Sequence, residues 1–380
     1  MIYFARCTVL RKLSINNHFS NTSDMSVTLF DPIKIGNIEL RNRVIMAPLT
    51  RKRATRDNVP TPIMETYYRQ RSGAGLIISE ATNISEEAIG YHDTPGIFTG
   101  EQVNKWKKIT GGVQDEGGQI YLQMWHTGRH SHPKLLPGGK WPLGPSAIGE
   151  SGEVNTPEGH FPAVVPKAMT TEDIDRTVND YRNAAQNALK AGFDGVEIHG
   201  ANGYLPHQFL MQSSNHRDDE YGGSFANRFR FLRRIIEEVS DACGPEKTGL
   251  RLSPVFTRRD MEDPDNIELF EYVVKEVDDY NLAYLHLTEP MSKGPLVEQW
   301  TGRIAPHFRK FYNGKLMICG GYDHEKAQKV LAEGHADMVV FGRLFISNPD
   351  LVERFRKGLD LKPWDEDTFY EGGEKGYVDY

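Results

Sequence analysis

The chain has 380 residues, of which 38% are hydrophobic and 26% are charged, a composition typical of a folded globular protein. Its formal net charge is −7, which gives no electrostatic reason to expect binding to nucleic acid or to an anionic membrane. The longest apolar runs are only a few residues long, whereas a helix that spans a bilayer needs about 20 apolar residues.

The first 25 residues differ in composition from the rest of the chain. They include several basic residues but no acidic residue before Asp24, a pattern that resembles an organelle transit peptide. Met25 is an alternative start. We therefore expect residues 1–25 to be disordered or a targeting segment, and residues 26–380 to form one domain. The expected location is the cytoplasm, or a mitochondrion or plastid if the leader is a transit peptide.

Eight short apolar runs alternate with amphipathic stretches along the remaining chain. Each run is continuous rather than alternating in polarity, as expected of parallel strands that are buried on both faces. The predicted strands are residues 43–47, 76–80, 119–123, 195–199, 249–253, 283–287, 316–319 and 338–341. Eight such strands, each followed by a helix, predict an α/β fold that closes into a single (β/α)8 barrel, the TIM barrel.

The clearest predicted helix follows Thr170. Thr170 and Asp173 match a capping box, apolar residues then recur at helical spacing, and Gly192 stands where a glycine often ends a helix. Before this helix, residues 128–167 are rich in Pro and Gly and separate the third predicted strand from the fourth. Because this excursion leaves the barrel at the carboxyl end of a strand, we expect a lid or a hairpin rather than a second domain.

Two glycine clusters follow the seventh and eighth predicted strands. Gly320 and Gly321 follow one strand, and Gly342 precedes Arg343 after the other. In TIM barrels the loops at these places commonly bind phosphate, because exposed backbone amides point at the anion. Arg343 would add a charge-assisted hydrogen bond. The clusters therefore predict a phosphate site, although tight turns between strand and helix would also explain each cluster by itself.

Three polar residues lie close together at the end of the fourth predicted strand. His199 and Asn202 can converge on one carbonyl oxygen, where two donors make the carbonyl a better electrophile and stabilise an enolate. Tyr204 has a phenolic proton suited to general acid catalysis beside a carbanion. No second His or carboxylate lies at helical spacing, so we expect no metal site. Each residue alone could be an ordinary hydrogen-bonding residue, but the three together favour catalysis.

Arg251 lies inside the fifth predicted strand, where an unpaired buried charge would be very costly. One candidate partner is the N1/C2=O edge of a flavin, which gains negative charge on reduction. The other is a strand acid such as Glu80 or Glu197. Gln123 could serve the pyrimidine edge of the same ring, and Thr50 could donate to a flavin carbonyl. Ordinary polar packing would explain either of these last two residues equally well.

The chain resembles the Old Yellow Enzyme family from about residue 29 to its end. The matching segments are residues 29–32, 41–43, 47–51, 122–125, 197–205, 214–217, 219–224, 227–228, 249–254, 342–343, 347–349 and 376–380. The resemblance implies a (β/α)8 barrel with non-covalent FMN at the carboxyl ends of the strands. It also implies an ene-reductase that takes hydride from NADPH or NADH and passes it to the β-carbon of an enone, enal or nitroalkene. The partners would be small activated alkenes, and we expect a monomer or a homodimer.

The match also implies a role for each residue of the site. His199 and Asn202 would hold the activating oxygen of the substrate, and Tyr204 would protonate the α-carbon. The residues implied to contact FMN are Pro48, Leu49, Thr50, Ala81, Gln123, Arg251, Gly320, Gly321, Gly342 and Arg343. Trp125 would line the substrate site, with Tyr370 near its mouth. Two features depart from the pattern: Asn202 stands where some relatives have His, and the charged segment 255–266 matches nothing in the family.

A non-redox, phosphate-binding barrel such as an aldolase or isomerase is the main alternative. That class typically needs a Schiff-base lysine or a carboxylate base at a strand end. Glu80 could be such a base, but no Lys ends a predicted strand. Relatives that reduce dienoyl-CoA would need iron–sulfur cysteines, and Cys7, Cys243 and Cys319 are too far apart to form such a motif.

Overall fold

The computed structural model describes residues 27–261, 263–290, 297, 300 and 303–380, so the predicted leader lies outside the described residues. Eight strands of a nine-stranded parallel sheet close into a barrel, because β11 pairs with β6 as well as with β12, and the ninth strand, β5 (Thr82–Asn83), pairs with β6 beside the barrel. The barrel strands are β3 (Val44–Met46), β4 (Leu76–Ile78), β6 (Ile120–Trp125), β11 (Gly195–Gly200), β12 (Thr248–Leu252), β13 (Tyr284–Thr288), β14 (Leu316–Cys319) and β15 (Met338–Phe341). All eight predicted strands are confirmed, and with them the (β/α)8 barrel.

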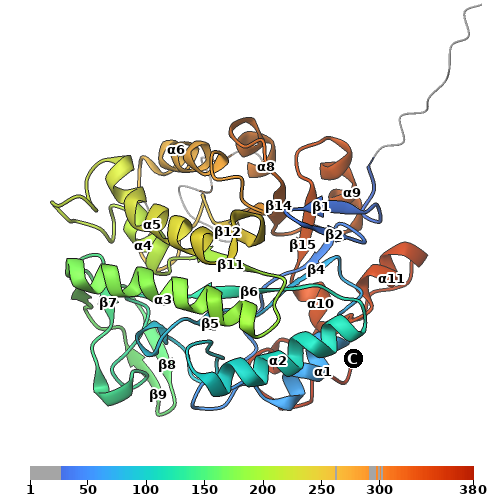
Figure 1. Cartoon of the computed structure of the whole chain (residues 1–380), viewed down its shortest axis with the longest axis horizontal. Coiled ribbons are helices and arrows are strands. Elements are labelled where there is room, and N and C mark those ends of the chain that lie inside the picture. The colour runs from blue at the N-terminus through green and yellow to red at the C-terminus, as the bar shows by residue number, and fades with distance from the viewer. Residues whose placement is uncertain (1–26, 262, 291–296, 298–299, 301–302) are drawn as a thin grey trace, which may run out of the picture.

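Helices surround the barrel on its outside (Figure 1). The α-helices are α1 (Pro62–Arg69), α2 (Gly100–Asp115), α3 (Thr171–Lys190), α4 (Leu205–Leu210), α5 (Phe225–Cys243), α6 (Asn266–Asp278), α8 (Ile304–Phe308), α9 (His324–Ala332), α10 (Arg343–Ser347) and α11 (Leu351–Lys357). Short 3-10 helices are η1 (Glu86–Ala88), η2 (Pro137–Gly139), η3 (Pro245–Lys247), η4 (Arg309–Phe311) and η5 (Glu366–Thr368). None of the helices within the described residues is long and apolar enough to cross a membrane.

Helix α3 begins and ends as its sequence predicts. The Thr170 hydroxyl accepts from the Asp173 amide at 3.2 Å, and the Asp173 carboxylate accepts from the Thr170 amide at 3.0 Å. Gly192 follows the last turn with a φ of +84°, a left-handed conformation that glycine adopts without steric cost. The helix packs beside α5, so both cover the same part of the barrel (Figure 1).

Apolar side chains from six of the eight barrel strands fill the barrel interior. Its buried cluster consists of Ile45, Ala47, Leu76, Ile78, Tyr121, Ala283, Tyr284, Met317, Cys319, Met338 and Val340, joined by Ile33, Ile35 and Leu40. The last three come from the antiparallel hairpin of β1 (Ile33–Ile35) and β2 (Ile38–Leu40). The hairpin lies at the amino-terminal ends of the strands, where Leu29 accepts a hydrogen bond from Arg43, and it closes that end. The carboxyl end of the barrel remains open for the candidate functional site.

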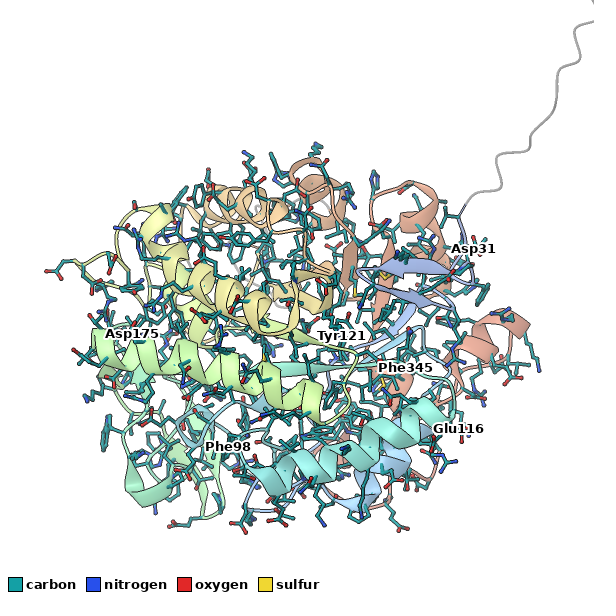
Figure 2. The ribbon with its side chains drawn as sticks, in the orientation of Figure 1. Asp31, Phe98, Glu116, Tyr121, Asp175 and Phe345 are labelled. Atoms are coloured by element: carbon teal, nitrogen blue, oxygen red, sulfur yellow. The ribbon has the colours of Figure 1, made fainter. Side chains whose placement is uncertain are left out.

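Two glycines make room for tyrosine rings inside the barrel. In the strand register Gly195 lies opposite Tyr121, and Gly249 lies opposite Tyr284. A Cβ atom at either glycine would lie only 2.3 Å from the ring of its tyrosine. Figure 2 shows Tyr121 inside the molecule, whereas Asp175 lies at the outer surface. Any larger residue at these two glycines would therefore displace a core side chain.

The predicted excursion after the third barrel strand contains a hairpin. β8 (Glu153–Thr156) pairs antiparallel with β9 (Gly159–Pro162), and β7 (Leu143–Gly144) pairs with β10 (Lys167–Ala168). Ser151 donates from its amide and its hydroxyl to the Asp260 carboxylate, at 2.6 and 2.8 Å. Because Asp260 belongs to the loop after β12, the excursion is tied to a second loop at the carboxyl end of the barrel.

Candidate active site

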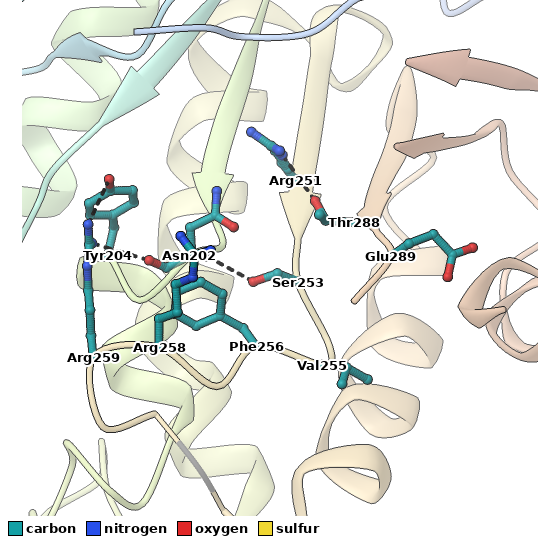
Figure 3. Close-up of a pocket in the computed structure, with 10 residues that line it drawn as sticks. All are labelled: Asn202, Tyr204, Arg251, Ser253, Val255, Phe256, Arg258, Arg259, Thr288 and Glu289. Atoms are coloured by element: carbon teal, nitrogen blue, oxygen red, sulfur yellow. Dashed lines mark hydrogen bonds between the residues drawn. The ribbon is translucent and has the colours of Figure 1, made fainter. Parts of the chain in front are cut away.

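The residues predicted to carry chemistry meet at the carboxyl ends of β11 and β12. The register places Arg251 between His199 on β11 and His286 on β13, so three basic side chains lie at one level. Two cavities, of about 250 and 700 Å³, have Asn202, Tyr204 and Arg251 as common lining residues, and Figure 3 shows the smaller cavity. A ligand in either cavity would therefore contact the same wall.

The larger cavity extends around the barrel from β12 to β3 and β15. The predicted site residues that line it are Pro48, Leu49, Thr50, Asn202, Tyr204, Arg251, Arg343 and Tyr370. In the sheet, β13 and β14 separate β12 from β15. A ligand that reaches both Arg251 and Arg343 must therefore be elongated, as a flavin ring with a phosphate-bearing chain is.

Arg251 is buried and has no carboxylate partner within 4 Å among the described residues. Its Nε donates to the Thr288 hydroxyl at 3.4 Å and its Nη2 to the Cys319 sulfur at 3.6 Å, both long contacts. Although burial raises it, Arg251 and His286 bring the pKa of the Cys319 thiol down to about 6. The Nη1 group makes no hydrogen bond to a described residue, so it is free to bind an anionic ligand edge. This fits the reduced flavin.

The acid expected as the alternative partner of Arg251 is engaged elsewhere. Glu197 accepts from Gln123 Nε2 at 2.7 Å, and its other oxygen lies 2.9 Å from His286 Nδ1. Although burial raises the pKa of Glu197, the charges of His286 and Arg251 lower it overall. Gln123 therefore faces a buried carboxylate and lines neither cavity.

Glu80, the candidate base of the non-redox alternative, lies away from both cavities. Burial raises its pKa to about 7, a value that would suit a general base. Its carboxylate accepts from the Tyr68 hydroxyl at 3.2 Å, and no part of the residue is exposed. A general base must reach the proton that it removes. Glu80 lines neither cavity, and its carboxylate has no hydrogen bond to a residue common to both linings. The geometry therefore does not favour an aldolase or isomerase.

His199 is a buried hydrogen-bond donor beside Tyr204, and the two ring centroids are 4.9 Å apart with perpendicular planes. Its Nδ1 accepts from the Ala201 amide at 3.3 Å. Burial, reinforced by the charge of Arg251, holds the pKa of His199 well below its usual value. The imidazole is therefore neutral at pH 7 and carries its proton on Nε2, from which it can donate to an oxygen.

Asn202 is fixed through its backbone and leaves its side chain free. Its φ is +58°, a left-handed conformation that Asn tolerates better than most residues. Its amide donates to the Ser253 hydroxyl at 2.8 Å, and its carbonyl accepts from Arg259 at 3.3 Å. The side-chain amide has no hydrogen-bond partner among the described residues and lines both cavities, so it can supply a second donor.

Tyr204 lies at the start of α4, with its hydroxyl near two groups that the sequence did not indicate. The hydroxyl is 3.4 Å from Arg259 Nη2 and 3.5 Å from the Tyr91 hydroxyl. Trp125 packs edge-on against the Tyr204 ring, with centroids 5.0 Å apart. The charged run in residues 255–266 was the one sequence signal of Arg259, and nothing in the sequence distinguished Tyr91.

The remaining predicted residues line neither cavity. Those outside both linings are Ala81, Gln123, Trp125, His199, Gly320, Gly321 and Gly342. Trp125 and His199 both contact Tyr204 and thus support the wall. Gly320 and Gly321 have φ values of +112° and +68°, which only glycine adopts readily. Their contact with a ligand stays a prediction.

Comparison with known proteins finds one family over most of the chain. Residues 28–362 match the model described as the NADH:flavin oxidoreductase / NADH oxidase family. The 12-oxophytodienoate reductase 1 of Oryza sativa subsp. japonica is 41% identical over 361 residues, covering 93% of each chain. A putative 12-oxophytodienoate reductase-like protein 1 of Arabidopsis thaliana is 41% identical over 327 residues, covering 86% of this chain and 99% of that protein.

Two solved structures have the same fold at similar identity. The old yellow enzyme homologue of Zymomonas mobilis superposes with a TM-score of 0.90 at 44% identity, covering 93% of this chain and 99% of that one. Morphinone reductase in complex with tetrahydroNAD gives a TM-score of 0.87 at 45% identity, covering 93% of this chain and 97% of that one.

Proposed function

Because the chain belongs to the NADH:flavin oxidoreductase / NADH oxidase family, the family of Old Yellow Enzyme, we propose how its residues divide the work of the reaction. The protein is an FMN-dependent ene-reductase. FMN, when bound, takes hydride from a nicotinamide and gives it to the β-carbon of an activated alkene. The observation that carries our assignment of residues is the wall common to both cavities, where Asn202, Tyr204 and Arg251 meet.

Two arginines would hold the two ends of FMN. Arg251, which has free donors and no carboxylate partner among the described residues, would bind the N1/C2=O edge of the ring. Arg343, on the far side of the larger cavity, would bind the phosphate together with the glycine clusters at 320–321 and 342. Pro48, Leu49 and Thr50 would line the ring between them, and Ala81 and Gln123 would support it from behind.

The substrate oxygen would accept hydrogen bonds from His199 Nε2 and from the Asn202 amide. Both donors are neutral, so they polarise the carbonyl through hydrogen bonds and not through a fixed positive charge. Tyr204 would then give its proton to the α-carbon. Relatives are named as reductases of 12-oxophytodienoate and of morphinone, and we propose small conjugated carbonyl compounds for this chain, with Trp125 and Tyr370 beside them.

We also propose that residues 26–380 act as one unit, as a monomer or a homodimer. The proposed location is the cytoplasm, unless the basic leader directs the chain to a mitochondrion or a plastid.

The cofactor and both half-reactions can be tested on the purified protein. We expect it to be yellow and to release FMN rather than FAD, because one phosphate site is indicated and no G-x-G-x-x-G motif is present for an adenosine half. Under anaerobic conditions a nicotinamide should bleach the colour, and a cyclic enone or nitroalkene should restore it. A colourless protein that cannot be reconstituted with FMN would contradict the assignment.

His199→Ala is expected to weaken binding of a phenolate, whose oxygen mimics an enolate oxygen. The loss should be about 1.5–3 kcal/mol, the range for a hydrogen bond to a charged group. The measurement is a titration that follows the long-wavelength charge-transfer band of phenol over the oxidised flavin. The imidazole is neutral at pH 7, so the loss should not depend on pH near neutrality.

His126→Ala is the matched control for this experiment. His126 directly follows β6, much as His199 lies near the end of β11, its Nδ1 accepts from the Gly128 amide at 3.0 Å, and burial lowers its pKa to about 4. Like His199 it lines neither cavity, but of the two only His199 has its ring against Tyr204. The control should lose stability and keep its phenol affinity. Equal phenol affinity in the wild type and in His199→Ala would remove His199 from the oxygen-binding role.

A further inference from the structure

Arg259 faces the two phenol groups of the site from the loop between β12 and α6. Its Nη2 donates to the Tyr91 hydroxyl at 2.7 Å and to the Tyr204 hydroxyl at 3.4 Å. The guanidinium carbon lies 4.5 Å from the centre of the Tyr204 ring (Figure 3). A permanent cation therefore lies beside the oxygen that would release a proton to the substrate.

Both the guanidinium and the backbone carbonyl of Arg259 are held by other parts of the chain. Its Nη1 donates to the Asn202 carbonyl at 3.3 Å, and the Arg259 carbonyl accepts from Arg129 Nη2 at 2.6 Å. Arg129 is buried and is itself bound to the carbonyls of Ile148 and Gly149 in the excursion. Although burial lowers the pKa of Arg259, the nearby phenols raise it overall, so the group stays charged.

The backbone at this position is held in an unfavourable conformation. Arg259 and Asp260 have φ values of +60° and +56°, a left-handed region that Arg rarely adopts, although Asp adopts it more often than most residues. The two hydrogen bonds from Ser151 to the Asp260 carboxylate help to maintain it. Strained residues that the surrounding contacts keep in place cluster at functional sites.

We propose that Arg259 positions the Tyr204 hydroxyl and stabilises the negative charge that forms on its oxygen during proton transfer. The inference rests on the proposed role of Tyr204. In the step, the O–H bond of Tyr204 breaks and a C–H bond forms at the α-carbon from the electron pair of the enolate. The tyrosinate is then reprotonated by water. Because Tyr91 binds the same guanidinium, it keeps the cation in reach of the tyrosinate.

Arg259→Met tests the proposal in the holoenzyme by stopped-flow measurement of each half-reaction. We expect reoxidation by 2-cyclohexenone to slow roughly 10- to 100-fold, somewhat less than the loss of a whole oxyanion donor or acid. Flavin reduction by a nicotinamide and reoxidation by a quinone should change little, because neither needs a proton on carbon. The solvent deuterium isotope effect on the enone step should rise. Arg259→Lys keeps the positive charge but lacks the planar guanidinium with its two terminal nitrogen donors, and it should recover part of the rate.

Combining Arg259→Met with Tyr204→Phe shows whether the arginine acts through the hydroxyl. The double variant should reoxidise no more slowly than Tyr204→Phe alone. If Arg259→Met slows the enone step by the same factor in both backgrounds, the proposal is overturned. If Tyr204→Phe slows it selectively and Arg259→Met does not, the proposal falls while the role of Tyr204 stands. If Tyr204→Phe has no selective effect, both fall.

Arg258→Met is the control for loss of charge near the cavities. Arg258 lines the smaller cavity next to Arg259, but it is exposed and makes no hydrogen bond or ion pair with a described residue, Tyr204 included. We expect its variant to keep the wild-type ratio of enone to quinone rates and the wild-type solvent isotope effect. The same change in both variants would show a general electrostatic effect and would overturn the proposal.

Discussion

Tyr204→Phe is expected to slow reoxidation of the reduced enzyme by a cyclic enone by about 10²- to 10⁴-fold, the usual contribution of general acid catalysis. The variant removes the hydroxyl and keeps the ring, so the edge-on contacts of the ring with Trp125 and His199 remain. Flavin reduction by a nicotinamide needs no proton from Tyr204 and should stay near the wild-type rate. Stopped-flow absorbance at the flavin band measures both steps separately.

A quinone distinguishes a proton donor from a binding residue. Its reduction places protons on oxygen, not on carbon, so a quinone should reoxidise the Tyr204→Phe enzyme as fast as the wild type. Equal slowing by enone and quinone would make Tyr204 a structural or binding residue. Normal rates with both would mean that water or another acid supplies the proton.

Tyr91→Phe removes a second hydroxyl only 3.5 Å from that of Tyr204 and is the matched variant. Tyr91 also binds Arg259 and stacks on Trp125, with centroids 5.4 Å apart. Its loss should slow the enone step by less than about tenfold, because it gives no proton to the substrate and acts on Tyr204 only through one long hydroxyl contact and through Arg259. A larger effect than that of Tyr204→Phe would exchange the roles of the two phenols.

The barrel could be predicted because its signals are local. A strand buried on both faces needs an uninterrupted apolar run, and each of the eight runs forms a strand in the structure. The capping residues Thr170 and Asp173 and the ending at Gly192 likewise depend on neighbours within a few positions. The predicted strands also fix where each strand ends, so the sequence alone places His199, Asn202 and Tyr204 at one end of the barrel.

The surroundings of Tyr204 could not be predicted, because they depend on segments far apart in the sequence. Arg259 and Tyr91 are 168 positions apart and meet only when the loops after β4 and β12 fold over the same barrel end. The same limit applies to Arg251. Whether its partner is an acid or a ligand depends on Glu197, which the structure shows engaged with Gln123 and His286.

Arg251→Met is expected to lower the affinity for FMN and for riboflavin by the same factor. Two charge-assisted hydrogen bonds at about 1.5–3 kcal/mol each correspond to a loss of roughly 10²- to 10⁴-fold. The apoprotein should remain folded, because no carboxylate among the described residues loses a direct partner. Titration of deflavinated enzyme with each flavin, followed by quenching of flavin fluorescence, gives both dissociation constants, and circular dichroism reports the fold.

Arg343→Met separates the two ends of the cofactor. Arg343 follows β15, which β13 and β14 separate from β12, the strand that carries Arg251. Arg343 is exposed at the rim of the larger cavity, whereas Arg251 is buried in its wall. If Arg343 binds the phosphate, its variant loses affinity for FMN and keeps its affinity for riboflavin, which has no phosphate. The opposite result, with Arg251→Met selective for FMN, would reverse the orientation of the cofactor across the barrel. If both variants lose affinity for FMN and for riboflavin equally, neither arginine binds the phosphate. The phosphate site would then have to consist of the glycines alone.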